Sequence, residues 1–244
     1  NFIRNFKAII QQFAPDKVYL VLEGHPKHRY ALYPEYKANR IVKEGQEEKK
    51  SFKAKFFEET NIILQLLQLF PVTIVKHQDF ECDDVINTLV HSLNKDENIV
   101  ITSDTDFYQL LETSNCKVYN STKKVFLEKF PYPYVVHKSL VGDKSDNIKR
   151  LMSEKKAEKL LDSPELFEEY LSTTEHQENF NINHQLIKFS DVPVEELQAE
   201  EYEFDLPALI DKFEEYKFES LLKESYLTVF TEVFSQLASK ENYP

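Results

Sequence analysis

Three short acidic clusters stand at the ends of apolar segments of this chain, at residues 81–84, 104–106 and 142–147. A fold that gathers them places seven carboxylates at one site, where they repel one another unless cations or protons neutralise them. Ligands that are all oxygen atoms favour Mg²⁺ or Mn²⁺ over zinc. The clusters therefore predict a divalent-cation site whose chemistry suits attack on a phosphate ester.

The apolar segments alternate between strand and helix patterns. Residues 17–22 form a nearly continuous apolar run, typical of a parallel strand buried on both faces, and residues 72–75 and 98–102 resemble it. Segments with helical spacing, 51–70 and 83–93, separate these runs. The order predicts an α/β fold with a mostly parallel central sheet and helices on both faces.

This topology places the acidic residues at one edge of the predicted sheet. Glu23 follows the first strand, and Asp104 and Asp106 follow the third. Ligands of open α/β sheets bind beyond the carboxyl ends of the strands, so we expect these residues and the 81–84 cluster to converge there. Each cluster taken singly is also typical of a helix cap or a turn. The coincidence of three clusters favours the metal site.

The rest of the chain carries weaker signals. Residues 116–127 predict a short hairpin, and the pattern from residue 134 to the end is helical. Residues 38–50 contain almost no apolar side chain and predict a loop. Only three glycines occur, so the sequence has no Gly-rich phosphate loop, and a P-loop enzyme is disfavoured.

Composition narrows the classes of function. A net charge of −12 opposes general adhesion to nucleic acid, so such binding must use local basic patches, which occur between Lys27 and Lys55 and between Lys144 and Lys159. Two cysteines, Cys82 and Cys116, offer no disulfide framework and suit a reducing compartment. Neither a signal peptide nor a long apolar span is visible, so we expect a soluble, cytoplasmic protein.

Four blocks of the sequence together resemble a known family. Residues 32–40, 81–86, 102–107 and 140–148 are similar, in the same order, to the signature blocks of the 5′-nuclease/flap endonuclease family. That family comprises the 5′-3′ exonuclease domain of bacterial DNA polymerase I, the phage 5′-exonucleases and phage ribonuclease H. The resemblance implies a PIN-like α/β nuclease core over residues 1–138, with a basic arch region at about 36–55, and a helical DNA-binding region over 139–244.

The resemblance also implies a role for individual residues. Two Mg²⁺ or Mn²⁺ ions are expected, held by Glu23, Glu81, Asp83, Asp84, Asp104, Asp106, Asp143 and Asp146. Lys37 and Arg40 match the basic residues that contact the scissile phosphate. The residues expected to bind DNA are Arg29, Lys37, Arg40, Lys144, Lys149, Lys155 and Lys156.

The chain departs from the family pattern at three places. The family has an Asp at the end of a first strand, whereas this chain begins in what resembles the following helix, so we expect that the strand is missing. Glu23-Gly24 stands where the family has Asp-Gly, and its longer side chain is expected to reach a metal directly or through water. Residues 149–161 lack the glycines of the family's helix-hairpin-helix, which weakens the expectation of duplex anchoring through backbone amides and K⁺.

The leading hypothesis is a structure-specific 5′-3′ exonuclease or flap endonuclease that removes RNA primers or 5′ flaps in DNA replication. Its expected partners are branched or 5′-ended DNA, RNA–DNA hybrid and replication proteins, and the chain is expected to act as a monomer in a phage or bacterial setting. Two alternatives stay open: a truncated or catalytically weakened branched-DNA-binding protein of the same fold, and a PIN-like ribonuclease.

Overall fold

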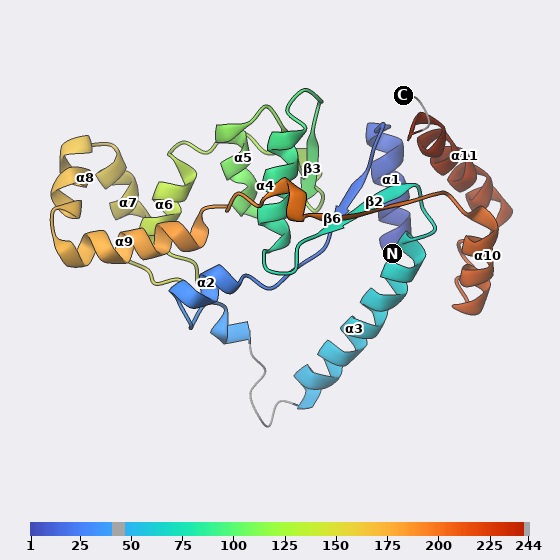
Figure 1. The fold of residues 1–244 in the computed structure, drawn as a ribbon, viewed down its shortest axis with the longest axis horizontal. Helices are drawn as coiled ribbons and strands as arrows, with labels where there is room; N and C mark the ends of the chain where they lie inside the picture. Colours follow the sequence, from blue (N-terminus) through green and yellow to red (C-terminus); the bar gives the residue numbers. More distant parts are fainter. Residues whose placement is uncertain (41–46, 242–244) are drawn as a thin grey trace. The chain divides into compact units, whose positions relative to one another are not determined.

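The computed structural model describes residues 1–40 and 47–241, and these form two compact units (Figure 1). Unit 1 is built from the described parts of Asn1–Leu22, Val42–Lys76 and Gln198–Pro244. Unit 2 is built from those of Glu23–Ile41 and His77–Leu197. The boundary expected after residue 138 falls inside a helix of unit 2, Tyr134–Val141, so the structure divides the chain differently.

Unit 1 contains a three-stranded sheet. Strand β2 (Val72–Lys76) pairs in parallel with β1 (Tyr19–Val21) and antiparallel with β6 (Gln198–Tyr202). The apolar side chains of β2 are buried, as its continuous apolar run predicts. Strand β6 was not predicted, because its sequence, Gln-Ala-Glu-Glu-Tyr, lies on an exposed edge and carries charges in place of apolar alternation.

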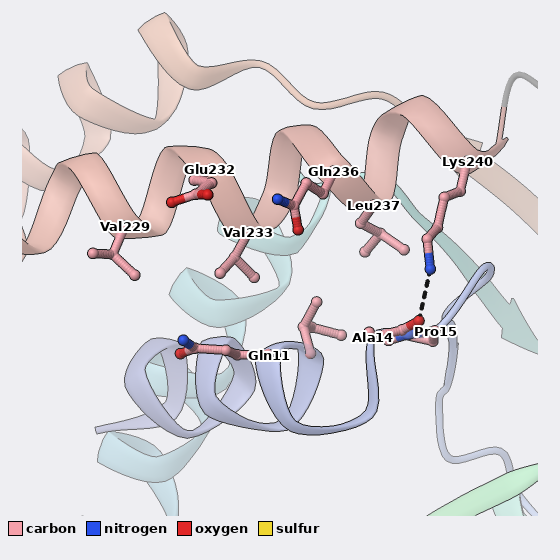
Figure 2. Close-up of a pocket in the computed structure, with 10 residues that line it drawn as sticks. Gln11, Ala14, Pro15, Val229, Glu232, Val233, Gln236, Leu237 and Lys240 are labelled. Carbon is pink, nitrogen blue, oxygen red and sulfur yellow. Dashed lines mark hydrogen bonds between the residues drawn. The ribbon is translucent and has the colours of Figure 1, made fainter.

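Helices cover this sheet with an aromatic core. Phe6, Phe70, Phe230 and Phe234 are buried, and their rings meet in edge-on and tilted contacts. Figure 2 shows a groove between two of the helices, α1 and α11, where Lys240 Nζ donates to the Ala14 carbonyl at 2.8 Å. The groove contains none of the predicted site residues. The helices are α1 (Phe2–Phe13), α3 (Glu47–Leu67), α10 (Leu206–Glu215) and α11 (Glu224–Glu241).

Unit 2 contains a second three-stranded sheet. Strand β4 (Lys117–Asn120) pairs in parallel with β3 (Ile99–Thr102) and antiparallel with β5 (Val125–Phe126), which confirms the predicted hairpin. The α-helices of its described residues are α2 (Lys27–Leu32), α4 (Cys82–Ser92), α5 (Tyr108–Thr113), α6 (Tyr134–Val141), α7 (Glu154–Leu161), α8 (Pro164–Leu171) and α9 (Thr174–Ile187). Three 3₁₀ turns accompany them: η1 (Ala38–Arg40), η2 (Thr105–Phe107) and η3 (Val194–Glu196).

The α/β class predicted from the sequence is confirmed, with one difference in the sheets. Within the described residues the strands form two sheets of three, each with one parallel and one antiparallel pair, in place of one central sheet. The loop expected at 38–50 is described only at its two ends, because residues 41–46 lie outside the described residues. Its beginning forms η1, and its last residues belong to α3, which begins at Glu47 in place of the expected loop. No helix among the described residues is long and apolar enough to cross a bilayer.

Candidate active site

The eight predicted metal-binding carboxylates all belong to unit 2, where Glu23 begins the site. Its Oε2 accepts a hydrogen bond from the Cys82 amide at 3.1 Å. Gly24 allows this approach, because a Cβ there would lie 2.0 Å from the His77 carbonyl oxygen. The His25 amide donates to the Gln78 carbonyl at 2.8 Å, so the segment from Glu23 lies against the loop that leads into α4.

The 81–84 cluster caps helix α4. Glu81 is the N-cap and accepts from the backbone at Asp84, while Asp84 Oδ2 accepts from the Glu81 amide at 3.3 Å, which completes a capping box. Asp83 and Asp84 lie in the first turn, where the helix dipole favours negative charge. The cap and the acidic site are therefore the same residues, and the two interpretations of this cluster do not exclude each other.

Arg29 is the buried counter-ion of this cap. Its side chain is 2% exposed and donates to both oxygens of Asp84 at 2.5 and 2.7 Å and to Glu81 Oε2 at 2.9 Å. Burial opposes the charged form, but the bonds to Asp84 and the charge of Glu81 outweigh it and raise the pKa of Arg29. Such burial commits the Arg29 guanidinium to the cap and does not support its predicted role in DNA binding.

Asp84 is likewise a structural residue in this arrangement. It is 0% exposed, and its Oδ1 also accepts from the Ser190 amide at 2.8 Å. Both oxygens already accept two hydrogen bonds each, so the side chain leaves no lone pair open to an ion. These contacts commit Asp84 to the α4 cap and do not support its predicted role as a metal ligand.

Lys37 and Arg40 lie against Glu81 and Asp146. The Lys37 ammonium pairs with Glu81 Oε1 and lies 3.8 Å from Asp146 Oδ2, and Arg40 pairs with Asp146. The Tyr36 hydroxyl lies 3.0 Å from Glu81 and 3.2 Å from Asp146. The Lys37 backbone has a left-handed φ of 56°, and its amide donates to the Asp146 carbonyl at 2.9 Å. Local strain of this kind is typical of functional positions.

The blocks at 32–40 and 140–148 lie against each other. Asn39 donates to the Lys144 carbonyl at 2.6 Å, and Asn147, itself left-handed, donates to the Glu35 carbonyl at 2.8 Å. Gly142 has a φ of 74° and lies so close to Lys149 that a Cβ would meet its carbonyl oxygen at 2.7 Å. The Asn39 and Asn147 hydrogen bonds therefore hold the two blocks against each other.

Lys138 joins two further carboxylates. Its ammonium pairs with Asp106 and lies 2.7 Å from Asp143 Oδ2, and the Tyr134 hydroxyl donates to Asp106 at 2.8 Å. Burial opposes an ammonium here, but the acids raise the pKa of Lys138. Burial alone would raise the pKa of Asp143, yet hydrogen bonds from Lys138 and Ser145 hold it at about 2. Sequence analysis missed Lys138 and Tyr134, because they lie on α6 outside every acidic block.

Three carboxylates have only uncharged donors among the described residues. Glu23 accepts from an amide, Asp104 accepts from the Asp106 amide at 2.8 Å, and Asp83 accepts from the Cys82 thiol at 3.4 Å. Burial raises the pKa of Asp83 to about 7, and the charges of Asp104 and Glu23 contribute to the shift. Near neutral pH this part of the site carries more negative charge than its surroundings stabilise.

The donor set fits hard divalent cations. All eight predicted ligands are carboxylates, and five of them, Glu81, Asp84, Asp106, Asp143 and Asp146, contact four cationic side chains, Arg29, Lys37, Arg40 and Lys138. The cations hold the acids in place but do not close them around one point. Across the described residues, the three ligand atoms that lie within 4.8 Å of one another belong to a different group, on α6 and α7.

The predicted DNA-binding lysines outside this network lie on the surface. Lys144, Lys149, Lys155 and Lys156 are exposed, and Lys149 Nζ lies 3.3 Å from the Asn179 amide oxygen. They occupy the loop after α6 and the start of α7. The loop after α6 and the start of α7 therefore carry exposed basic side chains in a chain of strongly negative net charge.

The sequence is similar to a known protein family and to characterised proteins. The family model for the 5′-3′ exonuclease, N-terminal resolvase-like domain matches residues 1–138. A 5′-3′ exonuclease of Mycobacterium tuberculosis is 30% identical over 115 residues, 45% of this chain and 36% of that protein. A DNA polymerase I of Caldicellulosiruptor bescii is 29% identical over 199 residues, 74% of this chain and 22% of that protein. The chain thus spans about a third or less of either relative.

Solved structures share the fold. The flap endonuclease of bacteriophage T5, in a complex with DNA and metal ions, aligns with a TM-score of 0.64 at 18% identity, covering 98% of this chain and 90% of that one. The T5 5′-exonuclease with bound divalent zinc ions aligns with the same TM-score at 17% identity, covering 97% and 90%. At this level of sequence identity, the similarity shows that the fold is shared.

Proposed function

The chain belongs to the 5′-3′ exonuclease N-terminal, resolvase-like domain family, and from that premise we propose that it hydrolyses phosphodiester bonds at 5′ ends or 5′ flaps of DNA with the help of divalent cations. One observation carries the proposal. A surplus of carboxylates, with Glu23, Asp83 and Asp104 lacking a cationic partner among the described residues, lies in one network with Lys37 and Arg40.

Mg²⁺ or Mn²⁺ ions are the proposed cofactors, two in number. The residues that would hold them are Glu23, Asp83 and Asp104, with Asp106, Asp143 and Asp146 beside them and Glu81 shared with Lys37. Such ions, when bound, lower the pKa of a water molecule and stabilise charge on a leaving oxygen. Asp84 and Arg29 are proposed to hold the α4 cap in position and to take no part in ion binding.

Lys37 and Arg40 are proposed to neutralise charge on the reacting phosphate. In the structure each of them pairs with a carboxylate, Lys37 with Glu81 and Arg40 with Asp146. Substrate phosphate can replace these partners, because an ammonium and a guanidinium bind either anion through the same donors. Charge neutralised at the reacting phosphate stabilises the transition state and raises the rate of the chemical step.

The substrate is proposed to be branched or 5′-ended DNA, with RNA–DNA hybrid accepted in primer removal and replication proteins as partners. Exposed lysines at 144, 149, 155 and 156 supply contacts with a phosphate backbone. Helix α3 of unit 1 exposes Phe52, Phe56 and Phe57 with 71%, 63% and 66% of each residue accessible. Exposed aromatic rings suit stacking on unpaired bases, which every 5′ flap contains.

An isosteric change at Asp104 tests the proposal. Asp104→Asn keeps the acceptor for the Asp106 amide and removes one unpaired charge. We expect single-turnover cleavage of a 5′-flap DNA in Mg²⁺ to fall by about 100-fold or more, with flap affinity changed little. Asp211→Asn, an exposed Asp on α10, is the matched control and should cleave as the natural chain does.

Two outcomes would contradict the proposal. Cleavage that survives Asp104→Asn, or that persists in excess EDTA, would remove the divalent-cation chemistry from this site. A natural chain that binds the flap tightly in Mg²⁺ and leaves it intact would instead identify a branched-DNA-binding protein of the same fold.

A further inference from the structure

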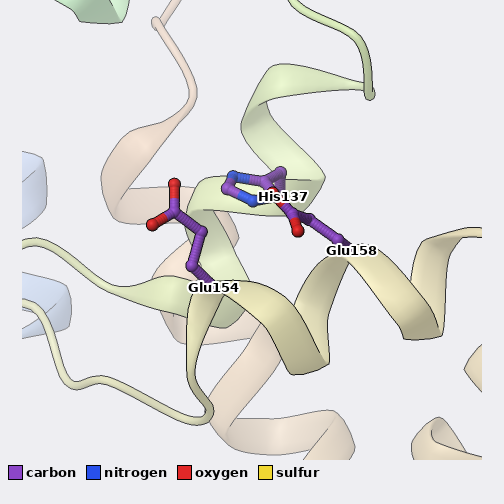
Figure 3. A group of neighbouring side chains, drawn as sticks. All are labelled: His137, Glu154 and Glu158. Atoms are coloured by element: carbon purple, nitrogen blue, oxygen red, sulfur yellow. The ribbon is translucent and has the colours of Figure 1, made fainter.

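A second group of ligand side chains lies in unit 2, apart from the eight carboxylates already described. His137 on α6 and Glu154 and Glu158 on α7 each offer a ligand atom, and these atoms all lie within 4.8 Å of one another. Figure 3 shows the imidazole lying between the two carboxylates. None of the three residues belongs to a block that suggested nuclease chemistry.

His137 has an unsatisfied nitrogen. Its side chain is 6% exposed, and its Nε2 is buried without a hydrogen-bond partner. Aromatic rings flank it, with Phe130 at 5.0 Å and Tyr132 stacked at 5.9 Å between ring centroids. A buried polar atom without a partner carries a free-energy cost, and such atoms are rare in folded proteins. A bound ligand at this nitrogen would remove that cost.

The two glutamates approach His137 on one face of α7. Glu154 and Glu158 are four residues apart, so their side chains project side by side, where like charges repel. Ala157 is fully buried with Leu140 and Phe180, and its small side chain allows α7 to lie close to α6. Neither glutamate forms an ion pair with another described residue. A cation would satisfy both carboxylates and the imidazole at once.

We propose that His137, Glu154 and Glu158 form a site for a divalent transition-metal ion of the zinc class, which fastens α7 to α6. One imidazole nitrogen and two carboxylate oxygens are a ligand set that zinc uses, with a fourth position open to water. An imidazole ligand selects against Mg²⁺, which prefers oxygen atoms only. Burial lowers the pKa of His137, which keeps the imidazole in the neutral form that ligates a metal, although the glutamates oppose the shift.

The proposed site differs in chemistry from the acidic network, and it does not depend on nuclease activity. The eight carboxylates supply oxygen ligands alone, whereas this site adds nitrogen. The two sites also use different faces of α6. Lys138, the next residue in the sequence, pairs with Asp106 and Asp143 of the network, while His137 faces α7.

Zinc titration against a chromophoric chelator, with the full chain carrying Asp83→Asn and Asp104→Asn, isolates the site from the acidic network. In that background we expect one zinc ion to bind per chain. Adding Glu154→Gln and Glu158→Gln should weaken zinc binding by about 100-fold or more. Loss of a residue that only hydrogen-bonds to a metal ligand already lowers metal affinity by about 10- to 100-fold, and these two changes remove ligands themselves. Adding Glu168→Gln and Glu169→Gln, an exposed pair on α8 with the same charge change, should leave binding unchanged.

X-ray absorption on the zinc-loaded background variant provides a second readout. The expected spectrum shows one imidazole in the outer-shell scattering, and His137→Gln should remove it. Zinc bound equally well after Glu154→Gln and Glu158→Gln, or a spectrum of oxygen ligands only, would overturn the proposal. Circular dichroism of each variant establishes that the chain is folded, so that lost binding reports on the ligands.

Discussion

The carboxylates of the candidate active site fall into two groups that face opposite electrostatic conditions. The paired group accepts from cationic side chains, and the unpaired group accepts from amides and a thiol only, within the described residues. The paired group is Glu81, Asp84, Asp106, Asp143 and Asp146; the unpaired group is Glu23, Asp83 and Asp104.

The difference in charge compensation suggests a different role for each group. Arg29 and Lys138 tie the paired group to α2 and α6, and this holds the acidic blocks together as the chain folds. The unpaired group accumulates charge that the protein itself does not neutralise, as the raised pKa of Asp83 indicates. Preorganised charge of this kind attracts a cation without further rearrangement. Under the proposed function, the unpaired group therefore supplies the ion ligands that have no counter-ion in the protein, and the paired group stabilises the fold beside them.

Removing a cation from the paired group should change the stability of the fold more than any other substitution considered. Arg29→Met removes the cation that contacts Asp84 and Glu81 and leaves two buried carboxylates without it. We expect the free energy of unfolding to fall by about 3–5 kcal/mol, the usual cost of leaving a buried charge unpaired. Urea denaturation measures it.

The control for this prediction is Arg150→Met, an exposed arginine whose Nε donates to the Met152 carbonyl at 2.9 Å. Its loss should change stability by less than about 0.5 kcal/mol, as is usual for surface substitutions. If Arg29→Met were as mild as Arg150→Met, the paired group would not stabilise the fold.

Removing a charge from the unpaired group should raise the free energy of unfolding, by less than Arg29→Met lowers it. The folded pKa of Asp83 is about 7, above its ordinary value, so the folded chain holds this proton more tightly than the unfolded chain. The stability that Asp83 contributes is present below about pH 4 and is lost as pH rises to about 7. Asp83→Asn should therefore stabilise the metal-free protein at pH 8 by about 1–3 kcal/mol, since one pKa unit corresponds to about 1.4 kcal/mol.

Denaturation curves at pH 4 and pH 8 in EDTA check the sign. The gain from Asp83→Asn should be present at pH 8 and nearly absent at pH 4, where the folded carboxyl group is protonated and the unfolded one is near its ordinary pKa of about 3.9. A loss of stability at pH 8 would show that Asp83 is compensated in the folded protein and belongs with the paired group.

Much of the fold could be predicted from the sequence, because its signals are local. Helix α1 and strand β2 coincide with apolar patterns of the right period, and the β4–β5 hairpin surrounds a polar turn. Strand β6 was missed, because an exposed edge strand rich in glutamate lacks apolar alternation. The split into two sheets was missed as well, because strand pairing depends on contacts distant in sequence.

The acids of the site could be named from the sequence, and so could two of its cations, Lys37 and Arg40, but the roles of Arg29 and Lys138 could not. Each acidic block ends a strand or caps a helix, so its place followed from local pattern and family resemblance. Arg29 was expected to face DNA and instead lies buried, and Lys138 was not predicted at all. Both are single basic residues on helices, and only the tertiary fold determines which carboxylate each one contacts.

The central claim is that the unpaired group awaits a cation, and carboxyl-carbon NMR of a pH titration tests it most directly. In EDTA we expect one Asp carboxyl to titrate with a pKa of about 7, and its signal to disappear in Asp83→Asn. Saturating Mg²⁺ should move that titration to well below pH 5, because a bound cation favours the carboxylate. A carboxyl group that titrates near pH 4 in EDTA, or near pH 7 with Mg²⁺ present, would contradict the account.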